Sequence, residues 1–405
     1  MPIDFNPYVH NYMHQPIIEH PQVFKSCQPM RDTFIKSYDI DLNKVKIEKK
    51  SFGKIEKTGE VAQLYTIKNK NGMSVDLSTF GATIVGIKAQ NKDGHFIDVT
   101  HGYKNVTPYE KSPVGHAGGT IGPYANKISE GKFILNGEEY QLECNKDNGK
   151  SHSHGGTNGL DDQNWKSRTL KVGVEFTYTK KDMENGYPGN VKYKVIYRLD
   201  DENQLHIQYK VKSDKDTIVN LTNHNYFNLD GAENTEENSV LNHVVKLPNS
   251  SKLTPNNSMG IPTGEFMKVK NSTFDFTQAK RIGDVINEDH EQLKIAKGFD
   301  QNYCVDNYDG KTLIDVAEVK SEKTGINLKV STNLPGFQFY TANNLGKSAQ
   351  PAGKDGARYE TRSGFCVDPQ CYPNAINTES FKEKGILKAG EELNREIVYS
   401  FSVEK

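Results

Sequence analysis

The sequence predicts an all-β fold built from large antiparallel sheets, arranged as a sandwich or a closed barrel. Two observations predict it. Many short segments alternate apolar and polar residues with the period of two that half-buried strands show, and turn-forming dipeptides lie between these segments. Helical periodicity is almost absent. Many short strands at even spacing, separated by turns, are typical of sandwiches and barrels.

The strand signals recur from residue 65 onward, and the clearest alternation lies in residues 191–212, which we interpret as two strands. The dipeptides Asn71-Gly72 and Asn136-Gly137 supply the positive φ angles of a two-residue type I′ hairpin turn. The other predicted strands cover residues 65–67, 74–77, 83–87, 132–142, 174–179, 218–221, 336–341 and 396–403.

Residues 1–48 differ from the rest because they contain several prolines and little periodicity, so we interpret them as an N-terminal extension and residues 49–405 as one domain. The extension contains His10, His14 and His20 at uneven spacing, but no cysteine or carboxylate cluster completes a metal site there. It could cover a sheet edge, bind a partner or mediate dimerisation, and a monomer or a homodimer is expected.

Charge and hydropathy favour a small neutral ligand over a macromolecular partner. Lysine plus arginine number 51 and aspartate plus glutamate 52, so a formal net charge of -1 attracts neither nucleic acid nor an anionic membrane. No apolar run approaches the roughly 20 residues of a membrane-spanning helix. The first thirty residues match neither a secretory signal nor a transit peptide, which predicts a cytoplasmic location.

The five cysteines are an odd and scattered set, which suits a reducing compartment rather than a disulfide framework. None of them has zinc-finger spacing. Two of them, Cys304 and Cys366, lie close to acidic residues in the sequence, and we expect both to pack as small hydrophobes in an apolar layer.

The segment 220–229, N-L-T-N-H-N-Y-F-N-L, places His224 among four asparagines where core residues are expected. The strand pattern before it predicts that His224 lies on or just after a strand, inside a sheet. An imidazole held there can give or take a proton near neutral pH. The alternative is a structural histidine that only satisfies backbone groups.

Three further polar segments interrupt the strand pattern. Residues 151–159, S-H-S-H-G-G-T-N-G, contain His154 before two glycines that allow a sharp turn. Residues 297–303, K-G-F-D-Q-N-Y, place Asp300 beside amides, a composition suited to hydroxyl recognition. Residues 364–377, G-F-C-V-D-P-Q-C-Y-P-N-A-I-N, place Asp368 after an apolar run. These histidines and aspartates could also form a metal site, but sequence supplies no coordination geometry for one.

Taken together, these segments resemble the aldose 1-epimerase family, also called galactose mutarotases, over roughly residues 50–405. The resemblance implies a galactose mutarotase-like β-sandwich, or supersandwich, and no metal or organic cofactor. It also implies interconversion of the α and β anomers of free hexoses such as glucose and galactose. Further matching segments are S-T-F-G-A-T-I-V at 78–85, G-P-Y-A-N-K-I at 122–128, I-P-T-G at 261–264, F-D-F at 274–276, F-Q-F-Y-T at 337–341 and I-L-K-A-G-E-E at 386–392.

The resemblance also implies roles for individual residues. His224 would be the general acid that protonates the ring oxygen of the sugar, and Asp368 occupies the position of the carboxylate base. His154 would hold the ring-oxygen end of the sugar, and Asp300 would accept hydrogen bonds from a sugar hydroxyl. The remaining polar lining would come from Asn126, Lys127 and Gln338.

The sequence departs from the family pattern at three places. The base is usually glutamate, so Asp368 withdraws the carboxylate by about 1.5 Å, one carbon–carbon bond. Pro123 and Lys127 replace two arginines, and lysine lacks the planar fork of arginine. Gln301 stands where a histidine is common.

These departures leave two alternatives to an active epimerase. One is a sugar-binding or regulatory protein with weakened catalysis. The other is a hexose-6-phosphate 1-epimerase, which requires a basic cluster around the phosphate, whereas Lys127 is the single lysine or arginine among the matched groove positions.

Overall fold

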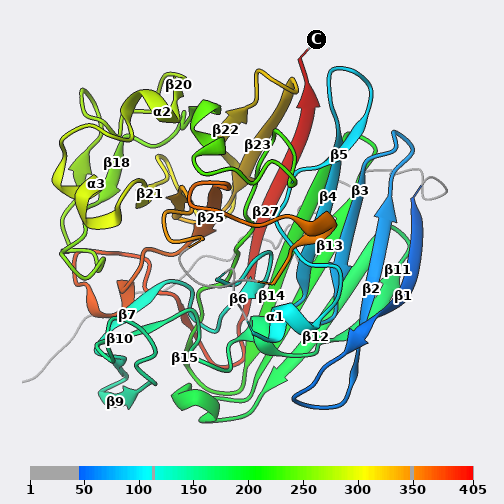
Figure 1. Cartoon of the computed structure of the whole chain (residues 1–405). Helices are drawn as coiled ribbons and strands as arrows, with labels where there is room; N and C mark the ends of the chain where they lie inside the picture. The colour runs from blue at the N-terminus through cyan, green and yellow to red at the C-terminus, as the bar shows by residue number, and fades with distance from the viewer. Residues whose placement is uncertain (1–44, 112–114, 347–350, 405) are drawn as a thin grey trace, which may run out of the picture. The chain divides into compact units, whose positions relative to one another are not determined.

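The computed structural model describes residues 45–111, 115–346 and 351–404. Strands dominate these residues and the helices are short, which confirms the predicted all-β class (Figure 1). The strands pair antiparallel in three large sheets and four two-stranded ones. Residues 1–44, with the three histidines of the predicted extension, lie outside the described residues, whereas residues 45–48 lead into and begin the first strand.

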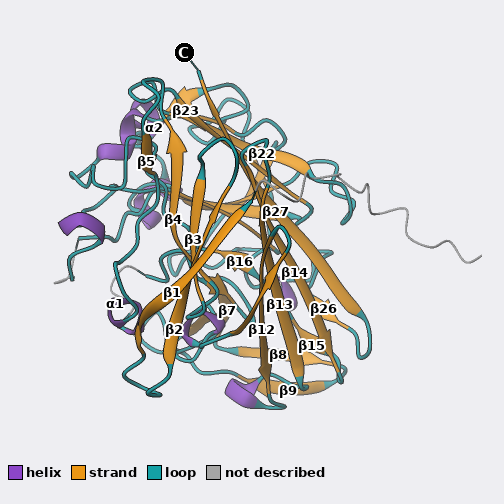
Figure 2. Cartoon of the chain, turned by 90° about the vertical axis from the view of Figure 1, so that its right-hand side faces the viewer, coloured by secondary structure: helices purple, strands orange, loops and turns teal. Residues whose placement is uncertain are grey.

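The first large sheet is a five-stranded meander in which each strand pairs with the next along the chain (Figure 2). A hairpin joins its second and third strands as predicted. The prediction of a two-residue type I′ turn at Asn71-Gly72 is wrong. Gly72 alone has a positive φ, and Asn71 donates to the backbone of Asp201, so this contact outweighs the local turn preference. The strands are β1 (Lys46–Lys54), β2 (Val61–Lys68), β3 (Ser74–Ser78), β4 (Thr83–Gln90) and β5 (Phe96–Asp98).

The second large sheet has nine strands in the order β11-β12-β13-β14-β27-β23-β22-β17-β20. Its centre is β27, which pairs with β14 on one side and β23 on the other. The two strands predicted within residues 191–212 are β13 and β14. The strands are β11 (Lys166–Leu170), β12 (Gly173–Lys180), β13 (Val191–Leu199), β14 (Gln204–Ser213), β17 (Val244–Lys246), β20 (Lys280–Arg281), β22 (Ile314–Lys320), β23 (Ile326–Thr332) and β27 (Glu392–Val403).

The third large sheet has five strands in the order β19-β18-β21-β24-β25. Two of the polar segments singled out in the sequence lie on it, since Asp300 begins β21 and Asp368 is at the centre of β25. The strands are β18 (Lys252–Thr254), β19 (Met267–Lys268), β21 (Asp300–Cys304), β24 (Gly336–Tyr340) and β25 (Cys366–Gln370).

Four two-stranded sheets complete the strand set. Asn136 and Gly137 both have positive φ angles, 53° and 84°, between β8 and β9, which confirms the second predicted hairpin turn. The predicted strand at 218–221 is mostly wrong, because Val219 and Asn220 donate to loop carbonyls rather than to a strand partner. The strands are β6 (Thr120–Ile121), β7 (Lys127–Ser129), β8 (Lys132–Leu135), β9 (Glu138–Gln141), β10 (Ser151–Ser153), β15 (Thr217–Ile218), β16 (Thr222–Asn223) and β26 (Ile386–Leu387).

The helices of the described residues are single turns or little more. None of them has the length and apolar composition that crossing a membrane requires. They are the α-helices α1 (Thr107–Glu110), α2 (Ile282–Val285) and α3 (Glu291–Ala296), and the 3-10 helices η1 (Leu160–Asp162), η2 (Glu184–Gly186), η3 (Ser239–Asn242), η4 (Lys354–Gly356) and η5 (Ala375–Asn377).

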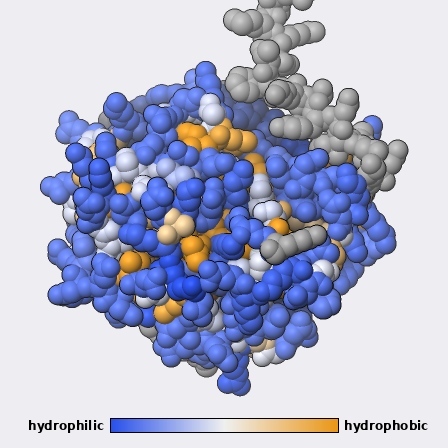
Figure 3. Space-filling model, turned by 90° about the horizontal axis from the view of Figure 1, so that it is seen from above, coloured by the Kyte–Doolittle hydropathy of each residue, from blue (hydrophilic) through white to orange (hydrophobic). Residues whose placement is uncertain are grey.

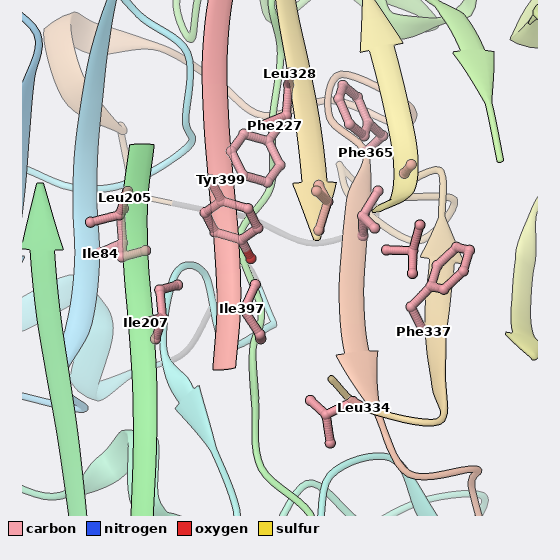
Figure 4. Close-up of a cluster of buried hydrophobic side chains, with 14 of the residues drawn as sticks. Ile84, Leu205, Ile207, Phe227, Leu328, Leu334, Phe337, Phe365, Ile397 and Tyr399 are labelled. Atoms are coloured by element: carbon pink, nitrogen blue, oxygen red, sulfur yellow. The ribbon is translucent and has the colours of Figure 1, made fainter. Parts of the chain in front are cut away.

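One large apolar core joins the three large sheets. Near its centre, Phe227 packs edge-to-face on Tyr399 of β27, with a ring-centroid distance of 5.2 Å, and Phe365 lies beside them (Figure 4). Burying a large apolar side chain stabilises a fold by about 1.5–3 kcal/mol. The packed core supplies a rigid support for polar residues on the sheet faces. The surface in Figure 3 is mostly hydrophilic, with apolar side chains in small separate groups.

Candidate active site

A groove of about 550 Å³ lies against one face of the sheet that contains β21, β24 and β25. The rest of its wall comes from loops next to β7, β10 and β16, from the loop after β18, from the end of α3 and from the residues after β24. The structure brings all seven predicted site residues to this lining. They are Asn126, Lys127, His154, His224, Asp300, Gln338 and Asp368.

The floor of the groove follows from strand register. Asp300 is opposite Tyr340, and Gln338 is opposite Asp368, across neighbouring antiparallel strands. Because residues two apart on a strand point to the same side, these four side chains share one face of the sheet. The intervening residues point into the apolar core, and they include Tyr303, Phe337, Phe339 and Val367.

Cys366 shares the groove face of the sheet, since it is the cross-strand partner of Tyr340. As predicted, it packs among apolar side chains, including Tyr226, but this is a small cluster separate from the main core. Its sulfur lies 3.6 Å from Nδ1 of His224. The sequence could not show this contact, because the two residues are far apart along the chain.

His224 follows β16 directly, as predicted. Its backbone N–H donates to the carbonyl of Gly119 and its carbonyl accepts from Gly118, so both backbone polar groups are satisfied in the sheet. Its ring stacks on Tyr226 at a centroid distance of 4.9 Å. The neighbouring Asn223 also donates to Gly118. Backbone pairing and ring stacking therefore hold the imidazole in one orientation at the groove wall.

His154 reaches the groove from a tight turn. Its φ is 54°, and its backbone N–H donates to the carbonyl of Asn126, while its Nδ1 accepts from the N–H of Asn126. The next residue must be glycine, because a Cβ on Gly155 would lie 2.0 Å from the carbonyl oxygen of Gly122. The two predicted glycines thus bring the chain close enough to place His154 in the groove.

A hydrogen-bond network links the polar residues of the floor. Gln338 donates through Nε2 to Oδ1 of Asp300 at 2.7 Å. The Oε1 atom of Gln338 accepts from Asn126 and from Gln370 at 3.3 and 3.2 Å. Burial raises the pKa of Asp300, and the hydrogen bond from Gln338 opposes this rise. The network orients a carboxylate oxygen and amide groups along one wall, which suits recognition of hydroxyl groups.

Lys127 lies at the mouth of the groove, and its positive charge is already paired with a carboxylate. Its ammonium lies 2.9 Å from a carboxylate oxygen of Asp147 and donates to the carbonyl of Met259. Lysine offers one cationic centre rather than the planar fork of arginine. At this position it therefore provides a single donor that is held by the groove wall.

His224 and Asp368 face each other, with 3.5 Å between Nδ1 and Oδ2. Burial, together with the positive field of His116, lowers the pKa of His224 to about 3. Burial and the charge of Asp300 raise the pKa of Asp368 well above its usual value. Burial therefore opposes both the protonated imidazole of His224 and the ionised carboxylate of Asp368. The second oxygen of Asp368, Oδ1, is buried and has no hydrogen-bond partner among the described residues.

Sequence reasoning missed His116, which also lines the groove. Its Nδ1 lies 2.6 Å from Oδ2 of Asp161, and its ring lies 4.9 Å from that of His154 and 6.3 Å from that of His224. Burial lowers the pKa of His116, but the Asp161 carboxylate outweighs burial and the net shift is upward. The available signal was a histidine just before Gly118 and Gly119 and close to the G-P-Y-A-N-K-I segment.

The sequence and the fold both resemble those of known proteins. The family model for aldose 1-epimerase matches residues 63–400. Galactose mutarotase from Sus scrofa is 34% identical over 89% of this chain and 99% of its own length, and aldose 1-epimerase from Escherichia coli is 32% identical over 85% and 97%. The solved structure of galactose 1-epimerase from Lactobacillus acidophilus superposes with a TM-score of 0.75 at 26% identity, covering 89% of this chain and all of that one. An aldose epimerase homologue from C. elegans superposes with a TM-score of 0.73 at 28% identity, covering 83% and 97%.

Proposed function

The chain belongs to the aldose 1-epimerase family, and we propose that it interconverts the α and β anomers of free hexoses such as galactose and glucose in this groove. The observation that carries the proposal is the facing pair of His224 and Asp368, beside a network of hydroxyl-binding groups. Mutarotation needs one group that removes the proton of the anomeric hydroxyl and one that protonates the ring oxygen.

In the proposed mechanism, Asp368 accepts the proton of the anomeric hydroxyl while His224 gives a proton to the ring oxygen. The bond between the anomeric carbon and the ring oxygen breaks, which leaves an open-chain aldehyde and a hydroxyl. The aldehyde then rotates, and closure on its other face runs the same steps in reverse, so acid and base exchange roles. Protons balance over the cycle.

The pKa directions define what must happen before ring opening. The shifts oppose the protonated imidazole and the ionised carboxylate that ring opening uses, so proton transfer from Asp368 to His224 is part of the proposed mechanism. The 3.5 Å between the two groups is only slightly longer than a hydrogen bond, so a small approach of either side chain is sufficient. One proton shared by the pair serves both directions of the reaction.

The remaining predicted residues are proposed to bind the sugar. Asp300 accepts from a ring hydroxyl, and Gln338 and Asn126 hold its carboxylate and the neighbouring hydroxyls in place. His154 faces the ring-oxygen end, and Lys127 donates at the mouth. A hydrogen bond to a charged group contributes about 1.5–3 kcal/mol, so a few of them orient a weakly bound hexose.

We further propose a cytoplasmic location and a monomer or homodimer. The cysteines of the described residues, Cys144, Cys304, Cys366 and Cys371, are free thiols, which supports a reducing compartment.

Polarimetry of freshly dissolved α-D-galactose and α-D-glucose tests the proposed activity. Wild-type protein should speed the approach to equilibrium rotation above the buffer rate, His224→Ala should remove the acceleration, and the exposed control His95→Ala should retain it. If wild type is inactive and Asp368→Glu is active, the chain is a sugar-binding relative that lacks a well-placed base.

Glucose 6-phosphate in the same assay tests the remaining alternative. A clear preference for the phosphate ester over free glucose would show that the substrate is a hexose 6-phosphate rather than a free hexose. Three lysines line the groove, Lys127, Lys146 and Lys297, and Lys127 is already paired with Asp147.

A further inference from the structure

Three side chains at the groove floor bring metal-ligating atoms together. Nδ1 of His224 lies 3.6 Å from Sγ of Cys366 and 3.5 Å from Oδ2 of Asp368, and all three atoms lie within 4.8 Å of one another. The group joins two elements, since Cys366 and Asp368 are on β25 and His224 follows β16. It is the one such group found among the described residues.

The two separations from His224 match the edges of a zinc tetrahedron. Zinc binds thiolate sulfur at about 2.3 Å, imidazole nitrogen at about 2.0–2.1 Å and carboxylate oxygen at about 2.0–2.2 Å, which places tetrahedral ligand atoms about 3.3–3.6 Å apart. The measured 3.6 and 3.5 Å lie in or close to this range. An ion can therefore contact His224 together with either partner at the present distances, and the ligand atoms of Cys366 and Asp368 lie within 4.8 Å of each other.

The surroundings also suit a bound cation. Oδ1 of Asp368 is buried without a hydrogen-bond partner, although a carboxylate oxygen in such a place normally has one. Burial is nearly complete for all three residues, with exposed fractions of 7% for His224, 0% for Cys366 and 4% for Asp368. His224 and Asp368 nevertheless line the groove, so the fourth position of a tetrahedron faces the space where a sugar would lie. Three protein ligands and one open position are the arrangement of catalytic zinc sites, in which the fourth position holds water or substrate.

We propose that Cys366, His224 and Asp368 form a site for Zn²⁺, and that the bound ion inhibits the epimerase. The ion occupies the space between the two groups that exchange protons with the sugar and takes a lone pair from each. The thiol and the carboxyl group lose their protons on binding, because a ligand must be deprotonated. A set with thiolate and imidazole selects zinc over magnesium or calcium, which prefer oxygen ligands.

Direct binding can be measured without any sugar. Co²⁺ added to the full-length protein should produce the near-ultraviolet charge-transfer absorption of a cobalt thiolate, and Zn²⁺ should displace it. Cys366→Ser should lose this absorption. The matched control is Cys304→Ser, which changes a buried cysteine on β21 of the same sheet and should keep the absorption. A cobalt spectrum without thiolate absorption in wild type would overturn the site.

Inhibition is the second measurement, and it rests on the proposed function. Zn²⁺ should slow mutarotation of galactose in competition with the sugar, a chelator should restore the rate, and Mg²⁺ should have no effect. Loss of an outer-shell partner of a metal typically costs 10–100-fold in affinity, so loss of the thiolate itself should raise the inhibition constant at least about 100-fold. Each variant is compared with its own rate in chelator.

The two measurements separate the two proposals. Cobalt thiolate absorption in a protein without mutarotase activity would support the metal site and contradict the proposed function. Mutarotase activity that Zn²⁺ leaves unchanged, with no cobalt thiolate absorption, would overturn the metal site alone. Inhibition that Cys366→Ser leaves unchanged would place the inhibitory ion elsewhere and would also overturn it.

Discussion

Nδ1 of His224 lies 3.5 Å from Oδ2 of Asp368, and the two residues are held by different sheets. His224 follows β16 of a two-stranded sheet, whereas Asp368 is at the centre of β25 in a five-stranded one. The separation is slightly longer than a good hydrogen bond, so the two side chains are not fixed to each other. Each is oriented by its own backbone, which leaves both free to exchange protons with a ligand.

Replacing Asp368 with asparagine should lower kcat for galactose mutarotation at least about 100-fold, because general acid–base groups contribute typically 10²–10⁴-fold. The fold should tolerate the change, since burial favours the neutral acid and the amide has almost the same shape. Polarimetry measures the rate, and thermal unfolding should show little change in Tm. Unchanged kcat would exclude Asp368 as the base.

Replacing Asp300 with asparagine should raise KM for galactose about 10- to 100-fold, which corresponds to one hydrogen bond to a charged group, and should change kcat much less. The amide keeps the size of the side chain that Gln338 contacts but loses its charge. Initial rates over a range of galactose concentrations separate the two constants. The exposed control Asp93→Asn should alter neither, and a fall in kcat alone would assign Asp300 to the chemical step.

Removing the carboxylate of Asp161 should lower the pKa of His116. Burial already acts in that direction, and the carboxylate is what outweighs it. Nuclear magnetic resonance of the imidazole C–H signals against pH measures the change, with the signal assigned by its loss in His116→Gln. Asp162→Asn is the matched control, because Asp162 pairs with Lys57 and should have a much smaller effect. The same midpoint in Asp161→Asn and wild type would contradict the assignment.

His206 should make the free energy of unfolding fall as the pH rises into the alkaline range. Its ring nitrogens lie 3.0 Å from Glu396 and 3.2 Å from Asp200, and although burial lowers its pKa, these carboxylates raise it to about 9. A pKa raised above the unfolded value of about 6.5 contributes stability that is complete below that value and is lost as pH rises through the folded pKa. The expected contribution is on the order of 3 kcal/mol.

Urea unfolding at about pH 6 and about pH 10 tests this expectation, with the unfolded reference near pH 6.5. Wild type should lose more stability between the two than His206→Gln, since other groups titrate equally in both proteins. His95→Ala, at an exposed position, should behave as wild type. Equal losses in wild type and His206→Gln would show that the ion pairs at His206 do not stabilise the fold.

Strand periodicity predicted the large sheets because side-chain alternation is a local property. The pair β13 and β14 follows directly from it, and so does the hairpin at Asn136-Gly137, where no other contact competes. The turn at Asn71-Gly72 and the strand at 218–221 could not be predicted, because their backbone groups bond to residues distant in the sequence. Hydrogen bonds to distant parts of the chain determine the local structure at both places.

The site was predictable where a motif contains the residue, as at His154 and Asp368. The site was not predictable where the function depends on contacts between groups that are distant in the sequence. His116 pairs with Asp161 across a long stretch of chain, and Cys366 reaches His224 through sheet register. The pKa shifts of His224 and Asp368 likewise depend on burial, which no motif contains.

The position of β27 has a consequence for synthesis on the ribosome. Its partners β14 and β23 both precede it in the chain, so the nine-stranded sheet is divided into two parts until residues 392–403 emerge. Each part then has an unpaired edge, and such edges pair readily with other chains. A nascent chain that stalls before β27 should therefore be prone to aggregation, and its solubility during translation should depend on chaperones that cover β14 and β23.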